Sequence, residues 1–156
     1  MKLYLKQKVF TWGDKFTVYD ENGNDRYYVE GEVLTWGKKL HLTNLSGREL
    51  AFIKQKITFF LPQYSIIRNS TEIAKVIREF TFFSQEYTVN GFGWTVKGDF
   101  LAHEYEILQC GHTVVTVSKE WFTWGDAYRI ETAPGVDVVN ALAVVLVIDA
   151  CLESNS

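Results

Sequence analysis

Apolar and polar positions alternate along most of the chain in a repeating unit that is typical of β-strands. The unit begins at Lys6, Glu30, Lys54, Ile77 and Ser118, and none of these five copies needs a gap to align with the others. Each copy has an apolar residue at place three and two more at places ten and twelve, which share one face of a strand because the side-chain period is two. Place six is always aromatic, giving the set Trp12, Trp36, Phe60, Phe83 and Trp124. A weaker sixth copy covers residues 96–107.

Each unit predicts a β-hairpin. Val, Ile, Thr, Tyr and Phe are common in both halves of the unit, and turn-forming residues such as Gly13-Asp14 stand between the halves. Asn22-Gly23, the strongest turn signal in the chain, separates the first two units. Six hairpins amount to about twelve strands, and an open sheet of that size leaves apolar edges exposed. The sequence therefore predicts an all-β fold with one buried helix: a closed antiparallel barrel of about twelve strands over residues 2–133.

Residues 136–152 break the alternation, because this run is almost wholly apolar and its only charges are Asp137 and Asp149. A run of this length without alternation is long for a strand, so it predicts a helix over about 137–152 with Asp137 as its N-cap. A membrane span needs about 20 apolar residues, whereas a barrel of about twelve strands has a wide lumen that must be filled. We therefore expect the helix to thread the barrel, with Asp137 and Asp149 at its two mouths.

Composition narrows the class of protein. The chain has 156 residues, of which 47% are hydrophobic, with 5 Trp, 8 Tyr and 11 Phe; this excludes a disordered chain and fits a single domain over residues 1–156. The formal net charge of -3 argues against nucleic acid as a partner. Cys110 and Cys151 are too few for a disulfide scaffold, and the first residues lack the apolar core of a signal peptide. We expect a cytoplasmic protein.

Several segments together resemble the LURP-one-related family. They are Lys6–Phe16, Asp20–Asn24, Ala51–Lys56, Glu79–Phe83, Gly98–Ile107, Lys119–Asp126 and the helix over residues 142–150. The family's fold is similar to the C-terminal domain of tubby proteins and to the phospholipid scramblases. The resemblance covers nearly the whole chain and implies a twelve-stranded barrel around a central C-terminal helix, but no agreed activity. Tubby-like domains bind phosphoinositides through basic residues and scramblases act on lipids, although kinship of fold is a weak reason to assign either function.

No part of the sequence favours an enzyme. His41, His103 and His112 have no metal-ligand spacing, and the serines lie in no nucleophile elbow. Asp137 and Asp149 are twelve residues apart on one helix, which separates them by about 18 Å along its axis and excludes a catalytic carboxylate pair. We therefore predict a non-enzymatic binding or scaffold protein with no catalytic residues, no cofactor and no metal.

The aromatic residues at place six of the repeat are the first candidate site. Equivalent turns of an up-and-down barrel lie at the same end, so these residues should form a girdle at one rim: Trp12, Trp36, Phe60, Phe83 and Trp124. One interpretation is that they close the barrel over an end of the helix. The other is that some of them are exposed and enter a membrane interface.

Lysines that recur in the repeat are the second candidate site. Residues 1–78 hold 13 of the 16 Lys and Arg against 8 Asp and Glu, whereas residues 79–156 hold 3 against 11. Lys6 and Lys8 match Lys54 and Lys56 in the repeat, and residues two apart point to the same side of a strand. These four lysines are either ordinary solvated strand surface or a site for anionic headgroups.

The two candidate sites favour peripheral binding to an anionic membrane surface, through anionic phospholipid or phosphoinositide. The first alternative is a protein-protein interaction module that uses the aromatic rim, and the second is a lipid-handling role by kinship with the scramblases. Exposed aromatics beside lysines favour lipid, whereas a flat apolar patch without basic residues favours a protein partner.

Overall fold

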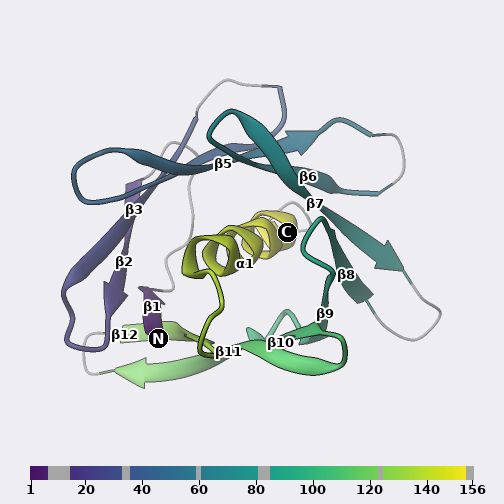
Figure 1. Cartoon of the computed structure of the whole chain (residues 1–156). Coiled ribbons are helices and arrows are strands. Elements are labelled where there is room, and N and C mark those ends of the chain that lie inside the picture. The colour runs from purple at the N-terminus through teal and green to yellow at the C-terminus, as the bar shows by residue number, and fades with distance from the viewer. Residues whose placement is uncertain (7–14, 33–35, 59–60, 81–84, 123–124, 154–156) are drawn as a thin grey trace.

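The computed structural model describes residues 1–6, 15–32, 36–58, 61–80, 85–122 and 125–153. Within them, twelve strands are followed by one helix (Figure 1). The strands are β1 (Lys2–Lys6), β2 (Lys15–Asp20), β3 (Asp25–Gly31), β4 (Lys39–Thr43), β5 (Glu49–Lys56), β6 (Gln63–Arg68), β7 (Thr71–Phe80), β8 (Gln85–Asn90), β9 (Trp94–Asp99), β10 (Glu104–Gln109), β11 (His112–Phe122) and β12 (Gly125–Thr132), and the helix is α1 (Val138–Glu153).

The strands form one closed antiparallel barrel. Each strand pairs with its neighbours in the chain, and β1 pairs with β12, where Leu3 lies opposite Ile130 and Leu5 opposite Tyr128. Closure gives each described strand a partner on both sides, so the barrel presents no apolar sheet edge. The predicted fold class is confirmed, including the number of strands.

The sequence repeat corresponds to hairpins made of an odd-numbered strand and the even-numbered strand after it. Its five clear copies supply β1–β2, β3–β4, β5–β6, β7–β8 and β11–β12. Places ten and twelve fall in the second strand of each hairpin and point into the barrel, where burial of their apolar side chains stabilises the closed sheet. Nine of these ten residues are buried: Val18, Leu40, Leu42, Tyr64, Ile66, Tyr87, Val89, Tyr128 and Ile130.

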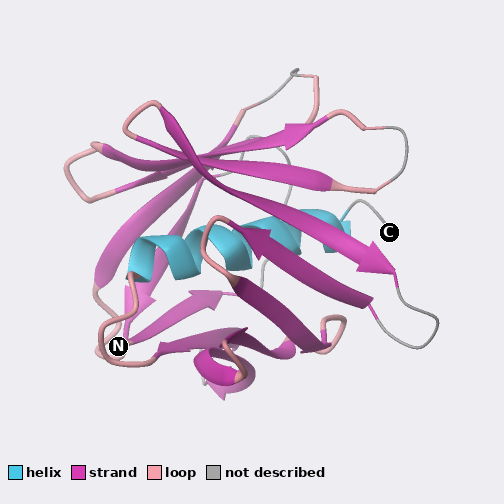
Figure 2. Cartoon of the chain, turned by 45° about the vertical axis from the view of Figure 1, so that its right-hand side comes forward, coloured by secondary structure: helices cyan, strands magenta, loops and turns pink. Residues whose placement is uncertain are grey.

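α1 runs through the barrel and is surrounded by the strands, as Figures 1 and 2 show from two directions. Every side chain from Ala141 to Ile148 is at most 1% exposed, which is the environment that a helix apolar on all faces requires. The observed helix confirms the one predicted over residues 137–152. In the described part of the chain, no helix has the length and apolarity that crossing a membrane demands.

The barrel has two mouths, which we name after the ends of the helix. The helix-start mouth holds the beginning of α1 and the turns that follow even-numbered strands, such as residues 21–24 and 69–70. The helix-end mouth holds the end of α1 and the described connections that follow odd-numbered strands, such as residues 36–38 and 100–103. Asp137 caps the first turn of α1, since its Oδ1 accepts a hydrogen bond from the Asn140 N–H at 3.0 Å, and Asp149 lies near the other end. Both positions agree with the sequence prediction.

Candidate functional site

The helix-end mouth carries the most exposed large apolar side chains of the described chain. Trp36 is 87% exposed, Leu101 84%, Trp121 76% and Ile57 71%. Trp36 precedes β4, Ile57 follows β5, Leu101 lies between β9 and β10, and Trp121 is near the end of β11, so all four are at the same end of the barrel. Exposed apolar side chains that occur together mark interaction sites more often than single ones do, and these four form two pairs.

Trp36 and Ile57 lie near each other because β4 and β5 are paired. The Lys38 N–H donates to Gln55 Oε1 at 2.9 Å, and the Gln55 N–H donates to the Lys38 carbonyl oxygen at 2.8 Å. Gly37 makes this close approach with a φ of 74°, and a Cβ at that position would lie 3.3 Å from the Gln55 carbonyl oxygen. The segment 36–38 is thereby held against the end of β5, two residues before Ile57.

Three lysines lie on the outer wall of the same two strands. Lys39 on β4 stands directly opposite Lys54 on β5, and neither lysine forms an ion pair with a described residue. Lys56, on the same side of β5, lies 3.4 Å from Glu72. Because opposed like charges are destabilising in a sheet, an anion bound at the Lys39–Lys54 pair would stabilise it. We call the set Trp36, Lys39, Lys54, Lys56 and Ile57 the β4–β5 corner.

The other exposed pair lies on the far side of the same mouth. In the strand order, β5 and β11 are separated by five strands in either direction, which places Trp121 opposite the β4–β5 corner. Leu101 lies in the neighbouring turn between β9 and β10. The Lys119 Nζ lies 5.1 Å from the centre of the Trp121 ring, a cation–π contact. We call Leu101, Lys119 and Trp121 the β9–β11 corner.

The structure brings together part of the predicted lysine set. Lys54 and Lys56 share the outer face of β5, whereas Lys6 ends β1 and is separated from them by β2, β3 and β4. Lys8 lies outside the described residues. The neighbour of Lys54 is instead Lys39, which no position of the repeat marks as basic.

Of the five residues in the predicted aromatic girdle, one lies among the described residues. Trp36 lies at the helix-end mouth and is exposed to solvent. The other four members lie outside the described residues: Trp12, Phe60, Phe83 and Trp124. Sequence reasoning missed Ile57 and Trp121, although both occupy place three of the repeat, which is apolar in all five copies. Leu101 lies inside the weaker sixth copy of the repeat, over residues 96–107, where the alignment singled out no position.

Inside the rim, polar side chains secure the end of α1. The Lys38 Nζ donates to the Ala150 carbonyl oxygen at 2.6 Å, where a cation is favoured by the helix dipole. The Tyr128 hydroxyl donates to Asp149 Oδ2 at 2.6 Å. The His103 ring stacks on Tyr128 with 4.6 Å between ring centres and 4° between planes, and burial holds the pKa of His103 below its usual value.

These interior groups offer little for nucleophilic or metal chemistry. Cys151 is 1% exposed, and burial raises the pKa of its thiol to about 11, so the thiol stays protonated at neutral pH. Among the described residues, no group of three or more His, Cys, Asp or Glu side chains is placed to hold a metal ion. The exposed apolar and basic residues of the mouth are its candidate binding surface.

Comparison with known proteins gives a consistent assignment. The family described as LURP-one-related matches residues 1–149. The uncharacterized protein YxjI of Bacillus subtilis (strain 168) is 32% identical over 155 residues, which cover 99% of this chain and 96% of YxjI. The X-ray structure of a protein from Arabidopsis thaliana superposes with a TM-score of 0.71 at 17% identity, over 96% of this chain and 90% of that one. With its repeat, its closed barrel and its central helix, the chain belongs to the LURP-one-related family.

Proposed function

We propose that the protein is a binding protein that associates peripherally with anionic phospholipid surfaces, its helix-end mouth facing the bilayer. The observation that carries this proposal is the placement of the exposed apolar residues on opposite sides of one rim. Trp36 and Ile57 lie on one side, and Leu101 and Trp121 lie on the other. A broad, flat partner contacts both sides at once, and a membrane surface has that shape.

The residue types at the rim suit the headgroup region of a bilayer. Tryptophan has an apolar ring and a polar indole N–H, and it is enriched where membrane and water meet. Trp36 and Trp121 are both available for such contacts, because each is more than three-quarters exposed. Full burial of a large apolar side chain is worth about 1.5–3 kcal/mol, so shallow insertion of these residues contributes a fraction of that amount each.

Electrostatic attraction adds to insertion but does not replace it. Each basic residue close to an anionic surface contributes about 1 kcal/mol, so Lys39 and Lys54 together supply about 2 kcal/mol. Glu72 partly neutralises Lys56 at 3.4 Å. Even a millimolar dissociation constant requires about 4 kcal/mol. We therefore expect binding to need the apolar and the basic residues of the mouth together.

The contacts at the rim favour lipid over a protein partner. In the β4–β5 corner Lys39 is three residues from Trp36 along the chain and stands opposite Lys54, and in the β9–β11 corner Lys119 lies over Trp121. Both corners thus combine an exposed aromatic with a cation, which is the pattern of interfacial segments. A protein-protein interaction module that uses the same rim is the alternative that the following experiment separates.

Vesicle sedimentation tests the proposal. Wild-type protein should sediment with phosphatidylcholine vesicles that contain phosphatidylserine and hardly at all with phosphatidylcholine alone. Two double variants should lose this binding: Trp36→Ser/Ile57→Ser and Lys39→Glu/Lys54→Glu. The matched control is Leu45→Ser/Arg48→Glu, which changes an exposed apolar and an exposed basic residue at the helix-start mouth and should bind as wild type does.

The same assay tests the four-lysine site expected from the repeat. Replacing Lys6, Lys8, Lys54 and Lys56 by Glu should abolish sedimentation, and Lys54→Glu/Lys56→Glu should account for most of the loss. Binding should weaken as salt rises, because the Debye length falls to about 3 Å at 1 M. Adding a phosphoinositide to the vesicles distinguishes general attraction from headgroup selection. Equal sedimentation of rim variants and wild type, or no binding to any vesicle, would show that the membrane proposal is wrong.

A further inference from the structure

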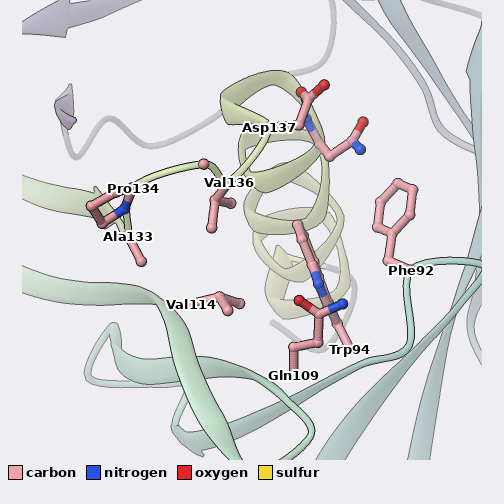
Figure 3. Close-up of a pocket in the computed structure, with 10 residues that line it drawn as sticks. Phe92, Trp94, Gln109, Val114, Ala133, Pro134, Val136 and Asp137 are labelled. Carbon is pink, nitrogen blue, oxygen red and sulfur yellow. The ribbon is translucent and has the colours of Figure 1, made fainter.

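A pocket of about 370 Å³ opens at the helix-start mouth, at the opposite end of the barrel from the proposed membrane face (Figure 3). It lies among the turn between β8 and β9, the end of β10, the start of β11 and the connection that leads into α1. Its volume falls in the lower part of the range of small-molecule sites, which is about 300–1,000 Å³.

The walls of the pocket combine apolar, aromatic and polar residues. Phe92 and Trp94 form a tilted pair with 4.9 Å between ring centres and 59° between planes. Val114 and Val136 lie on the other side of the pocket in Figure 3. Since an apolar cavity of about 150 Å³ is large enough for benzene, this pocket has room for one aromatic ring that carries a polar substituent.

Hydrogen-bond donors without a protein partner line the same space. Trp94 is 7% exposed, and its indole N–H donates to no described residue while keeping some access to solvent. Gln109 stands directly opposite Trp94 in the β9–β10 ladder, and its side-chain amide also bonds to no described residue. Asn140 accepts from Arg68 through Oδ1 at 2.9 Å, which leaves its Nδ2 group as a third donor. The lining therefore suits a ligand with an acceptor oxygen.

The charge at the pocket is balanced, because Asp137, the charged residue of its lining, is paired with Arg68. Asp137 Oδ2 accepts from Arg68 at 2.9 Å, and its Oδ1 accepts from the Asn140 N–H at 3.0 Å. Burial alone would raise the pKa of Asp137, but these hydrogen bonds and the guanidinium outweigh burial and lower it. The carboxylate and the guanidinium offset each other, so the pocket favours an uncharged ligand over an anion or an ammonium group.

We infer that the pocket binds a small uncharged molecule that combines an aromatic ring with a carbonyl oxygen. The ring lies between the Phe92–Trp94 wall and the two valines, and the carbonyl accepts a hydrogen bond from the Trp94 indole N–H. This inference is independent of membrane binding, because the two sites lie at opposite mouths and share no residue.

Three small probes test the inference on the full chain: benzamide, benzoate and benzylammonium. They share one ring and differ in the charge of the substituent. Followed by the indole N–H resonances in NMR, benzamide should bind in the millimolar range expected of a ligand with so few atoms and shift the Trp94 signal. Benzoate and benzylammonium should bind several-fold more weakly. Equal binding of the three probes, or no binding of benzamide, would overturn the inference.

Two variants and a matched control locate the bound probe. Trp94→Phe keeps an aromatic wall and removes the donor, so benzamide affinity should fall several-fold, and the resonance that disappears assigns the Trp94 signal. Val114→Trp fills the pocket and should abolish binding in a protein whose melting curve shows it to be folded. Trp121→Phe, at the other mouth, should leave the affinity unchanged. Retained benzamide binding in Trp94→Phe and Val114→Trp would place the probe elsewhere and refute the site.

Discussion

The two mouths of the barrel are built from the same repeat, yet they present opposite surfaces to solvent. At the helix-start mouth, polar turns satisfy their own backbone: Asp20 accepts from the N–H groups of Asn22 and Asn24 at 2.9 Å. At the helix-end mouth, the connections hold Trp36 and Leu101 out in solvent. Connections are where a barrel can vary without disturbing its core, so they are where binding residues collect. The contrast is the reason why the membrane face is proposed at the helix-end mouth.

Inside the barrel, polar side chains at both mouths hold α1 in place. Arg68 binds both Asp137 and Asn140 at the start of the helix. Tyr128 binds Asp149 near its end, and Lys38 binds a carbonyl of the last turns. The helix is therefore secured at both ends by polar contacts, and between them by apolar burial. Variants of these contacts should change the stability of the barrel, whereas variants of the exposed residues at the helix-end mouth should not.

Removal of the helix should have the largest effect, because both mouths depend on it. Deletion of residues 136–156 exposes six large apolar side chains that are at most 1% exposed in the intact chain: Leu142, Val144, Val145, Leu146, Val147 and Ile148. At about 1.5–3 kcal/mol each, their burial is worth roughly 9–18 kcal/mol as an upper estimate, against a typical domain stability of about 5–15 kcal/mol. Expression and circular dichroism should show no folded protein; a soluble barrel that melts cooperatively would contradict the prediction.

Tryptophan substitutions at the two mouths should differ in how much they lower the free energy of unfolding. Trp94→Ala, at the helix-start mouth, removes a side chain that is 7% exposed and should lower the free energy of unfolding by about 3–5 kcal/mol. Trp36→Ala, at the helix-end mouth, removes one that is 87% exposed and should change it by less than about 0.5 kcal/mol. Urea denaturation measures both, and a large loss in Trp36→Ala would mean that the rim is structural.

A pair of Tyr→Phe variants should measure the hydrogen bond that secures the helix end. Tyr128 is 8% exposed and donates to Asp149 at 2.6 Å, so Tyr128→Phe should cost about 1.5–3 kcal/mol, as is typical of hydrogen bonds to charged groups. Tyr28 donates to Asp25 at 3.0 Å on the surface, so Tyr28→Phe should be nearly neutral. Equal unfolding midpoints for the two variants would show that Asp149 does not anchor the helix.

The smallest effect concerns pH at the helix-end mouth. Burial lowers the pKa of His103 in the folded state, so below a pH of about 6.5 the unfolded chain binds more protons than the folded chain does. The contribution of His103 to the free energy of unfolding is fully present above that pH. It falls as the pH drops below that value, and it becomes constant below the folded-state pKa. His103→Phe should remove this part of the pH dependence of urea unfolding, while His112→Gln, at an exposed position, should retain it. An unchanged pH profile in His103→Phe would count against the buried stacking on Tyr128.

The fold could be predicted because its information is local and repeated. Places ten and twelve of the repeat, for example Leu40 and Leu42, set the inner face of a strand, and a one-residue slip in register would turn that face to solvent. The apolar run that includes Leu146 has no alternation and so could only be a buried helix. The inner face of each strand and the buried helix can both be inferred without knowing which strands are neighbours.

The candidate site could be predicted only in part, because it is assembled across strands. Lys54 and Lys56 followed from the repeat, but the opposition of Lys39 to Lys54 depends on the register of β4 against β5. The separation of Lys6 from them depends on the order of strands around the barrel. Ile57 and Trp121 carried a repeat signal that predicts an apolar residue without telling which side of the rim it faces.

By itself, then, the sequence determined the hairpins, the number of strands, the closed barrel and the helix that fills it, since all of these follow from the period of apolar residues and the need to bury them. The tertiary structure alone decided that Trp36 and Trp121 face solvent on opposite sides of one mouth, that Lys39 stands against Lys54, and that the indole of Trp94 opens into a pocket. The physical reason is that burial constrains a residue through its own side chain, whereas a surface site depends on distances between residues that only strand register and barrel closure set.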